Sequence, residues 1–446
     1  FARLGEGLLS AGRAAEALVA IRRAIALTPE NTEYGQLLAQ AIETGGLDDN
    51  QAIAELKRMV AADAANVSTA TLLARVQARA GHVDDAAATL RASIARQPKG
   101  DREQQLLRNS LAQLFTDAQR YSEAVAVYEE ELKESGIGNT PPRTEEEKLF
   151  ASRVLQRIIE VYKRAGRVGD VAATIERMRQ LLGKDDPTPD AQHVVFLREQ
   201  GKRTEALQAA RSARQRYPEE TSFLQLEAQT LTDLGRVDEA VALVRAQLKN
   251  SIEDFDDYRF ISGLYLQAAR PPEAIEAARK ALELAPAGRA DMTEAALLTL
   301  SSAQERAGDL KGSEESLRRI LSRDPNNATA LNNLGYFLIE RNQRLDEALQ
   351  MIQRAVRANP NNSSFLDSLG WAYFKLGKLD EAERHLTEAA RRNNQSATIQ
   401  EHLGDLYEKR GKLEMARAAW QRALALSIEN GDTARLRAKL NGKTQN

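Results

Sequence analysis

The segment DSLGWAYFKLGKLDEAERHL, residues 367–386, decides the fold of this chain. Its first half places large apolar residues at helical spacing, which predicts a helix with one apolar face. Gly377 is the residue type that ends a helix in the left-handed conformation, and Asp380 lies where the dipole of a second helix favours acidic side chains. Gly370 and Ala382 are small, so the two helices can approach each other closely. The segment therefore predicts a pair of antiparallel helices with small residues at the contact.

Two neighbouring segments repeat this order: NNLGYFLIERNQRLDEALQMI from Asn332 and EHLGDLYEKRGKLEMARAAW from Glu401. Most steps between such units are 34 or 35 residues. Six of the twelve prolines fall just past the second helix, where proline ends one unit. A fixed period of this length predicts stacked repeats, here an all-α solenoid of about twelve helix pairs. The first unit is under way at Phe1, and the others start near residues 33, 67, 105, 152, 187, 221, 255, 294, 328, 363 and 397.

Two segments differ from the repeat pattern. SGIGNTPPRTEEEK, from Ser135, combines Gly, two prolines and an acidic run, which indicates a loop followed by an extended first helix. The loop is either a simple surface insertion or a hinge or partner contact. DTARLRAKLNGK, from Asp432, predicts an amphipathic capping helix with Leu436 and Leu440 inward. The expected organisation is divergent units in 1–138, a loop insertion in 139–151, central units in 152–327, consensus-like units in 328–430, and a capping helix with a polar tail in 431–446.

Composition describes a folded, helix-rich chain, with 42% hydrophobic, 28% charged and only 5% aromatic residues. The net charge of −2 gives no electrostatic reason to expect nucleic acid as a partner. No apolar run reaches the roughly 18 residues that a membrane-spanning helix needs. The chain opens at Phe1 without an initiator Met, so we expect the natural N-terminus, with any targeting signal, to lie upstream.

The chain carries no motif for catalysis or for holding a cofactor. It has no cysteine, and none of its four histidines belongs to a zinc-binding pattern. Phosphate-binding loops and nucleophile elbows are also absent from the sequence. We therefore expect no enzyme activity, no metal and no cofactor.

The repeat resembles the tetratricopeptide repeat family in its Leu-Gly-x-x-Tyr, Gly, Ala and Pro positions. That resemblance implies a right-handed superhelix whose first helices line a concave, protein-binding surface. The last 120 or so residues, about 328–446, also look like the end of bacterial envelope proteins of this family, which are often lipid-anchored at the outer membrane. Some of those proteins dock a carboxy-terminal processing protease and deliver its substrates. The similarity implies a periplasmic adaptor, anchored through the missing N-terminus, while a cytoplasmic location stays open.

Family members bind ligands through first-helix residues, so the resemblance also implies a site. No unit carries the Lys and Asn pair that holds a carboxyl terminus in this family, which argues against that binding mode. Ile339 and Phe374 have an alternative role, since the family often packs an aromatic residue there against the next unit. The expected partner-binding residues are an apolar strip of Tyr336, Ile339, Trp371 and Phe374, rimmed by Asn332, Asp367, Lys375 and Asp405.

The leading hypothesis is a non-enzymatic scaffold that binds one or more proteins or peptides and brings an envelope protease or cell-wall enzyme to its substrates. Two alternatives remain. The chain is either the regulatory repeat array of a larger, glycosyltransferase-type enzyme or a self-assembling structural subunit. The sequence leaves the partner's identity and the oligomeric state open.

Overall fold

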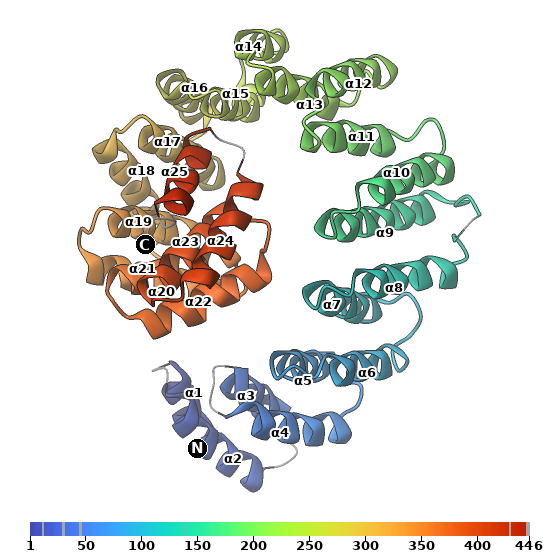
Figure 1. The fold of residues 1–446 in the computed structure, drawn as a ribbon, viewed down its shortest axis with the longest axis vertical. Coiled ribbons are helices and arrows are strands. Elements are labelled where there is room, and N and C mark those ends of the chain that lie inside the picture. Colours follow the sequence, from blue (N-terminus) through green and yellow to red (C-terminus); the bar gives the residue numbers. More distant parts are fainter. Residues whose placement is uncertain (11–12, 29–31, 44–46, 139, 428–429, 443–446) are drawn as a thin grey trace. The chain divides into compact units, whose positions relative to one another are not determined.

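The computed structural model describes residues 1–446 except 11–12, 29–31, 44–46, 139, 428–429 and 443–446. The described residues form twenty-five α-helices and one 3₁₀ helix, with no strand among them. They make twelve helix pairs and a final single helix, so the all-α solenoid expected from the sequence is confirmed (Figure 1). The chain divides into two compact units, Phe1–Phe196 (unit 1) and Leu197–Asn446 (unit 2).

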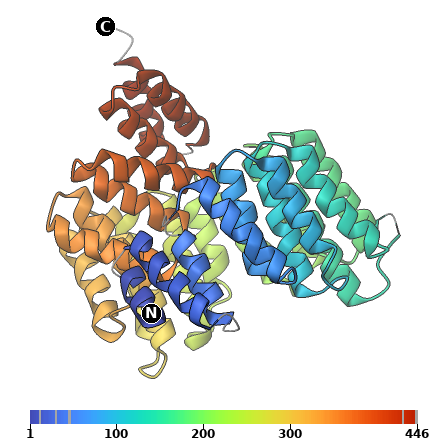
Figure 2. The ribbon, with the colours of Figure 1, turned by 90° about the horizontal axis from the view of Figure 1, so that it is seen from below.

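Unit 1 contains five helix pairs and most of an eleventh helix. Consecutive helices from α1 to α10 pack against each other, and Figures 1 and 2 show the helices from α5 to α10 side by side. The helices are α1 (Ala2–Ser10), α2 (Ala14–Leu27), α3 (Thr32–Glu43), α4 (Asp49–Ala62), α5 (Val67–Arg79), α6 (Val83–Ile94), α7 (Arg102–Asp117), α8 (Tyr121–Glu134), α9 (Glu145–Arg164), α10 (Val168–Leu182) and α11 (Thr188–Glu199), the last of which continues into unit 2.

Unit 2 holds the remaining helices. They are α12 (Arg203–Arg216), α13 (Thr221–Asp233), α14 (Val237–Arg245), η1 (Ile252–Asp254), α15 (Phe255–Gln267), α16 (Pro271–Leu284), α17 (Ala290–Arg306), α18 (Leu310–Arg323), α19 (Ala328–Glu340), α20 (Leu345–Ala358), α21 (Ser363–Lys375), α22 (Leu379–Arg392), α23 (Ala397–Lys409), α24 (Leu413–Leu426) and α25 (Asn430–Asn441).

The helix pair α21–α22 has the construction that its sequence predicts. Gly377 follows α21 with φ +75°, the left-handed conformation that glycine adopts without strain. A Cβ on Gly370 would lie 2.6 Å from the Leu386 Cγ and 2.9 Å from the Leu386 backbone nitrogen on α22. Ala382 and Leu386 are both fully buried. The small residues therefore mark the closest approach of the two helices.

The loop before α9 is shorter than the predicted 139–151 insertion. Helix α9 begins at Glu145, because Thr144 caps it by accepting a hydrogen bond from the Glu147 backbone N–H at 3.1 Å. The Glu147 carboxylate in turn accepts from the Arg143 backbone N–H at 2.6 Å. This reciprocal cap, with three glutamates in the first turn, extends the helix over residues that the sequence pattern assigned to the loop.

The N-terminal end of this loop contacts α10. Ile137 is buried, and Arg177 of α10 donates to the backbone carbonyl of Gly138 at 3.0 Å. The same guanidinium forms two hydrogen bonds with Glu129 of α8, at 2.6 and 3.0 Å. The Arg177 side chain therefore holds this end of the loop in place.

Helix α25 packs on the last pair as the expected capping helix. Leu436 is buried against Trp420 and Ala416 of α24, and Leu440 lies partly buried beside them. Arg435 and Lys439 lie four residues apart on one face of α25, as the residues that contact the neighbouring unit do on the preceding first helices. The cap therefore takes the place of the first helix of a further unit.

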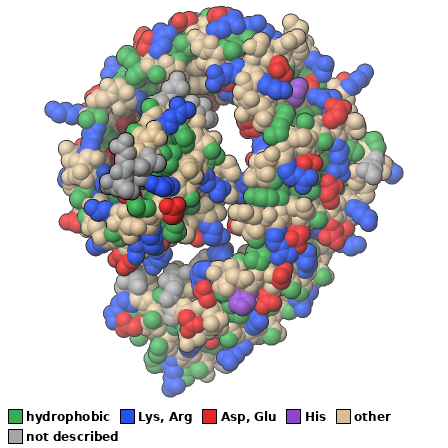
Figure 3. Space-filling view, viewed as in Figure 1, with side chains coloured by type: hydrophobic (Ala, Val, Ile, Leu, Met, Phe, Trp, Pro, Cys, Tyr) green, Lys and Arg blue, Asp and Glu red, His purple; other side chains and the backbone are tan. Residues whose placement is uncertain are grey.

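The surface carries charges of both signs. Basic and acidic side chains are interspersed on the face that Figure 3 shows. Among the described helices, none combines the length and the apolar character needed to cross a membrane.

Candidate partner-binding surface on the first helices of unit 2

The predicted site residues lie on three consecutive first helices of unit 2. Residues four apart share one face of a helix, so each helix presents a short row of side chains. We call the surface made by these three rows the first-helix face. The rows are Asn332, Tyr336 and Glu340 on α19, Asp367, Trp371 and Lys375 on α21, and Glu401, Asp405 and Lys409 on α23.

Trp371 is enclosed by its neighbours, being only 7% exposed. Its ring stacks on His402 from the next unit, with centroids 4.0 Å apart, and on Phe374 of its own helix at 4.7 Å. Its indole N–H donates to the Glu340 carboxylate on the preceding unit. The indole therefore links three units, and its ring is not presented to solvent.

His402 and Asp367 form a buried pair between α21 and α23. The His402 Nδ1 lies 2.9 Å from an Asp367 carboxylate oxygen. Burial disfavours the imidazolium, but the charge and hydrogen bond of Asp367 outweigh it, so the pKa of His402 is raised above 6.5. Glu340 and Asp405 act in the same direction from α19 and α23. A charged His402 therefore strengthens the contact between these units.

Asn332 and Tyr336 lie one turn apart on α19 at the edge of this cluster. Asn332 is buried, and its Oδ1 has no hydrogen-bond partner among the described residues. Tyr336 is half-buried, and burial, followed by the charges of Glu340 and Asp367, raises its pKa. The Oδ1 itself is inaccessible to solvent, so of these two residues it is the half-buried Tyr336 that a partner can contact.

The remaining predicted residues have packing or pairing roles. Ile339 is fully buried, and Phe374 is half-buried in the core between units. Both positions agree with the alternative role of packing against the next unit. Lys375 Nζ lies 3.8 Å from Glu340 and 5.1 Å from the centroid of the Trp371 ring. These positions do not test partner binding, which stays a prediction for the set.

Asp405 belongs to the contact with the capping helix. It accepts from the Trp420 indole N–H at 2.9 Å and from Lys439 at 2.7 Å. Beside it, burial raises the pKa of Glu401, but hydrogen bonds from Arg435 and Lys439 outweigh burial and hold that pKa down to about 2. These ion pairs fasten α25 to α23.

His402 was not among the predicted site residues. It pairs with Asp367, 35 residues earlier, and this spacing of about one repeat length is the sequence signal that could have found it. Among the residues that the structure describes, no group of three or more His, Asp or Glu side chains is placed to hold a metal ion.

Comparison with known families agrees with this architecture. A tetratricopeptide repeat model matches residues 71–139, 196–255, 298–363 and 368–432, and a second tetratricopeptide repeat model matches residues 351–384. Together these segments make up more than half of the chain. The chain belongs to the tetratricopeptide repeat family.

One curated relative is the TPR repeat-containing protein PA4667 of Pseudomonas aeruginosa. It is 32% identical over 150 residues, which are 33% of this tetratricopeptide repeat chain and 24% of that protein. The match therefore spans about a quarter of the relative.

Solved structures are similar at lower identity. Yeast Tom70 is 14% identical, with a TM-score of 0.49 over 99% of this chain and 94% of that chain. Pseudomonas aeruginosa pilF is 26% identical, with a TM-score of 0.34 over 43% of this chain and 85% of that chain. A thermophilic TPR protein of Thermus thermophilus is 22% identical, with a TM-score of 0.37 over 42% of this chain and 97% of that chain.

Proposed function

We propose that this tetratricopeptide repeat protein is a non-enzymatic adaptor that binds a partner protein on the first-helix face of unit 2. The family supports a protein-binding scaffold in general terms. The observation that carries the proposal is the half-buried Tyr336, which lies on the same face as the exposed Glu340 and Lys409. The contacts around Trp371 hold this edge in place before a partner arrives, which lowers the entropic cost of binding.

The partner that we propose is an envelope protease of the carboxy-terminal processing class, or a cell-wall enzyme, which the adaptor brings to its substrates. The resemblance of residues 328–446 to bacterial envelope repeat proteins supports this. The location that we propose with it is the bacterial periplasm.

Site-specific photo-cross-linking tests the binding surface. A benzophenone amino acid replaces Lys409, which is exposed on the first helix α23, so the fold is kept. The matched control places it at Glu381, which is exposed on the second helix α22. Cells of the source organism express each variant, and cross-linked species are identified by mass spectrometry. We expect one enzyme to be captured from Lys409 and not from Glu381.

A second assay tests delivery. The captured enzyme is purified, and its rate of substrate cleavage is measured with and without this chain; we expect the chain to raise the rate. Capture from Glu381 alone would contradict the surface. Cross-links only to a second copy of the chain would favour the self-assembling subunit instead.

A further inference from the structure

One edge of unit 2 is rich in arginine. It is the edge at which each second helix ends and the next first helix begins, in the units from α18 to α23. The segments 316–330, 350–366 and 387–400 make up this edge, and they hold seven arginines against two carboxylates. At the opposite edge, the segments 305–315, 340–347 and 375–384 hold seven basic and ten acidic residues. The two edges therefore carry opposite net charge.

Two neighbouring second helices, α18 and α20, each present two of these arginines about one turn apart. An ion pair of 3.0 Å between Arg318 of α18 and Glu347 of α20 places the two helices side by side. Arg354 of α20 also donates at 2.5 Å to the carbonyl of Pro325, just past the end of α18. We call these four residues the arginine patch: Arg319 and Arg323 on α18, and Arg354 and Arg357 on α20.

Carboxylates do not neutralise the arginine patch. Arg319, Arg323 and Arg357 are exposed, and none of the four arginines forms an ion pair with a residue that the structure describes. The hydrogen bonds of Arg354 go to the uncharged Pro325 carbonyl and Asn326 side chain. The nearby Asp324 accepts from the Asn326 backbone N–H at 3.0 Å instead.

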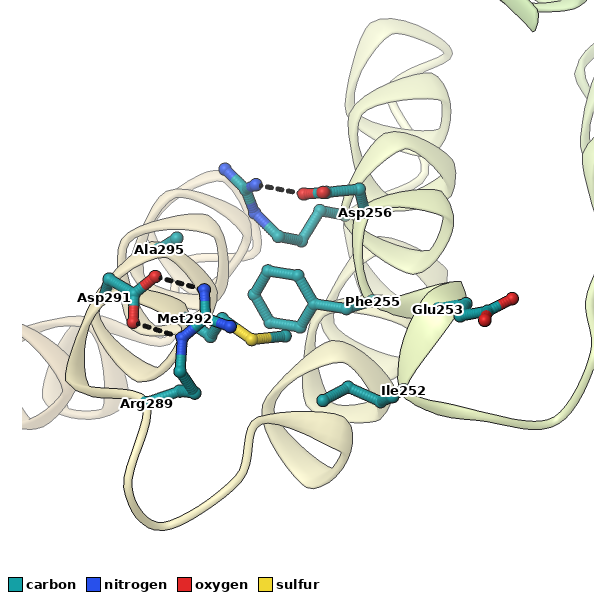
Figure 4. Close-up of a pocket in the computed structure, with 9 residues that line it drawn as sticks. Ile252, Glu253, Phe255, Asp256, Arg289, Asp291, Met292 and Ala295 are labelled. Atoms are coloured by element: carbon teal, nitrogen blue, oxygen red, sulfur yellow. Dashed lines mark hydrogen bonds and ion pairs between the residues drawn. The ribbon is translucent and has the colours of Figure 1, made fainter.

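Other arginines at this edge of unit 2 are paired. Figure 4 shows Arg289, in the loop before α17, beside Asp291, with nitrogen–oxygen distances of 2.9 and 2.7 Å. On α22, Glu388 accepts from both Arg391 and Arg392. The unpaired positive charge is therefore concentrated on α18 and α20.

The helix dipole accounts for only part of the patch. Basic side chains in the last turn of a helix offset its negative end, and Arg323 and Arg357 lie there. Arg319 and Arg354 lie before the last turn, each six residues after a buried small residue of its helix, Ser313 or Ala348. Because they hold equivalent positions, they project from the same side of adjacent helices.

The composition of this edge indicates the kind of partner. Stable protein interfaces have apolar side chains at their centre. The large hydrophobic side chains that are exposed among the described residues all lie outside the three segments of this edge. Guanidinium groups bind phosphate through paired hydrogen bonds, and clusters of about four to eight basic residues are typical of contacts with anionic lipids. The edge therefore fits a lipid surface better than a folded protein.

We propose that the arginine patch docks this edge of unit 2 on a membrane surface that contains anionic phospholipids. The four guanidinium groups bind headgroup phosphates, and no apolar side chain inserts into the bilayer. A fluid lipid surface brings a phosphate to each arginine without needing a matching shape. The proposal does not rest on the adaptor function, because the patch lies on second helices and not on the first-helix face.

The expected strength follows from the number of cations. Each basic residue near an anionic membrane strengthens binding about fivefold, so three arginines together contribute about 100-fold. The attraction acts across solvent and is screened by salt, so it should weaken steeply when ionic strength rises. Binding of this kind is reversible.

Co-sedimentation of the full chain with vesicles tests the proposal. The probe vesicles contain phosphatidylglycerol and phosphatidylcholine in equal parts, and the reference vesicles contain phosphatidylcholine alone. We expect the chain to bind the anionic vesicles at low ionic strength, to dissociate when salt is added, and not to bind the reference vesicles.

Two matched triple variants locate the contact. The patch variant removes exposed arginines, and the control removes exposed lysines of the opposite edge, so both lose the same charge. The patch variant is Arg319→Gln/Arg323→Gln/Arg357→Gln, and the control is Lys311→Gln/Lys378→Gln/Lys409→Gln. We expect the patch variant to bind anionic vesicles about 100-fold more weakly and the control to bind about as the parent does. Arg357→Gln alone should lose about fivefold, which keeps the test valid if the patch variant is destabilised.

Equal losses in the two triple variants would overturn the proposal, because net charge alone would then decide binding. Equal binding of the parent to both kinds of vesicle would also overturn it, since the phosphates would not be recognised. A fluorescein-labelled single-stranded oligonucleotide offers the same phosphate chemistry in another macromolecule. If it binds the parent and not the patch variant, while anionic vesicles bind neither, the partner is a nucleic acid and the membrane proposal is wrong.

Discussion

Replacing Gly370 by Ala should destabilise the C-terminal end of unit 2. The new Cβ would lie 2.6 Å from Leu386 Cγ and 2.9 Å from the Leu386 backbone nitrogen, against an ordinary contact of about 3.5–4.0 Å. A side chain can rotate away from such a contact, but a backbone nitrogen cannot, so α21 and α22 must separate by several tenths of an ångström.

The expected magnitude comes from two opposing effects. Overpacking a well-filled contact costs about 1–3 kcal/mol, and the backbone clash puts Gly370→Ala in the upper part of that range. Alanine in a helix gains about 1 kcal/mol over glycine. The net loss in free energy of unfolding should therefore be about 1–2 kcal/mol.

Tryptophan emission during urea unfolding measures this loss where it occurs. The chain has two tryptophans, Trp371 and Trp420, and both are buried in the last units. The control is Gly263→Ala on α15 of the same unit, where open space predicts no such loss. If Gly370→Ala unfolds at the same or a higher urea concentration than the parent, the helices do not meet at Gly370 as described.

Three further outcomes are expected. Because the pKa of His402 is raised in the folded chain, its charged form stabilises unit 2 fully below pH 6.5, and this stabilisation is lost as pH rises through the folded pKa. The His402→Gln variant should therefore lose this pH dependence of the urea midpoint. A variant whose urea midpoint depends on pH as the parent's does would contradict the prediction. Lys439→Met removes an ion pair with Glu401 and should speed hydrogen exchange in α25. In the parent, the Lys439–Glu401 contact should weaken as pH falls from 4.5 toward 2 and Glu401 is protonated. Unchanged protection of α25 would refute this. Arg177→Ala should speed tryptic cleavage in the 135–144 loop, and cleavage at the parent's rate would show that another contact holds it.

The fold could be predicted from sequence because its contacts are local and periodic. Gly370 and Ala382 indicated the closest approach of two helices, and the structure places both there. Helix boundaries were harder. The start of α9 depends on a cap at Thr144, and it lies six residues before the end of the predicted 139–151 insertion.

The sites were less predictable, since the sequence indicates which face a residue lies on and not what covers it. Trp371 was assigned to the right face, but His402 from the next unit stacks over it. At Gly263 within α15 no atom lies within 4 Å of the place where a Cβ would be, whereas at Gly370 the Leu386 side chain lies 2.6 Å from it. A single sequence does not distinguish that glycine from one required by packing.

The His402–Asp367 pair has a consequence for how such an array can grow. Repeat arrays lengthen when one unit is copied in tandem. If residues 363–396 were duplicated, Asp367 of the first copy would face Ser368 of the second in place of His402, because Ser368 holds the same place in its unit. Removing one member of a buried ion pair costs about 3–5 kcal/mol. This point of the array therefore resists tandem duplication. The order of these two units depends on an ion pair to which each contributes one residue.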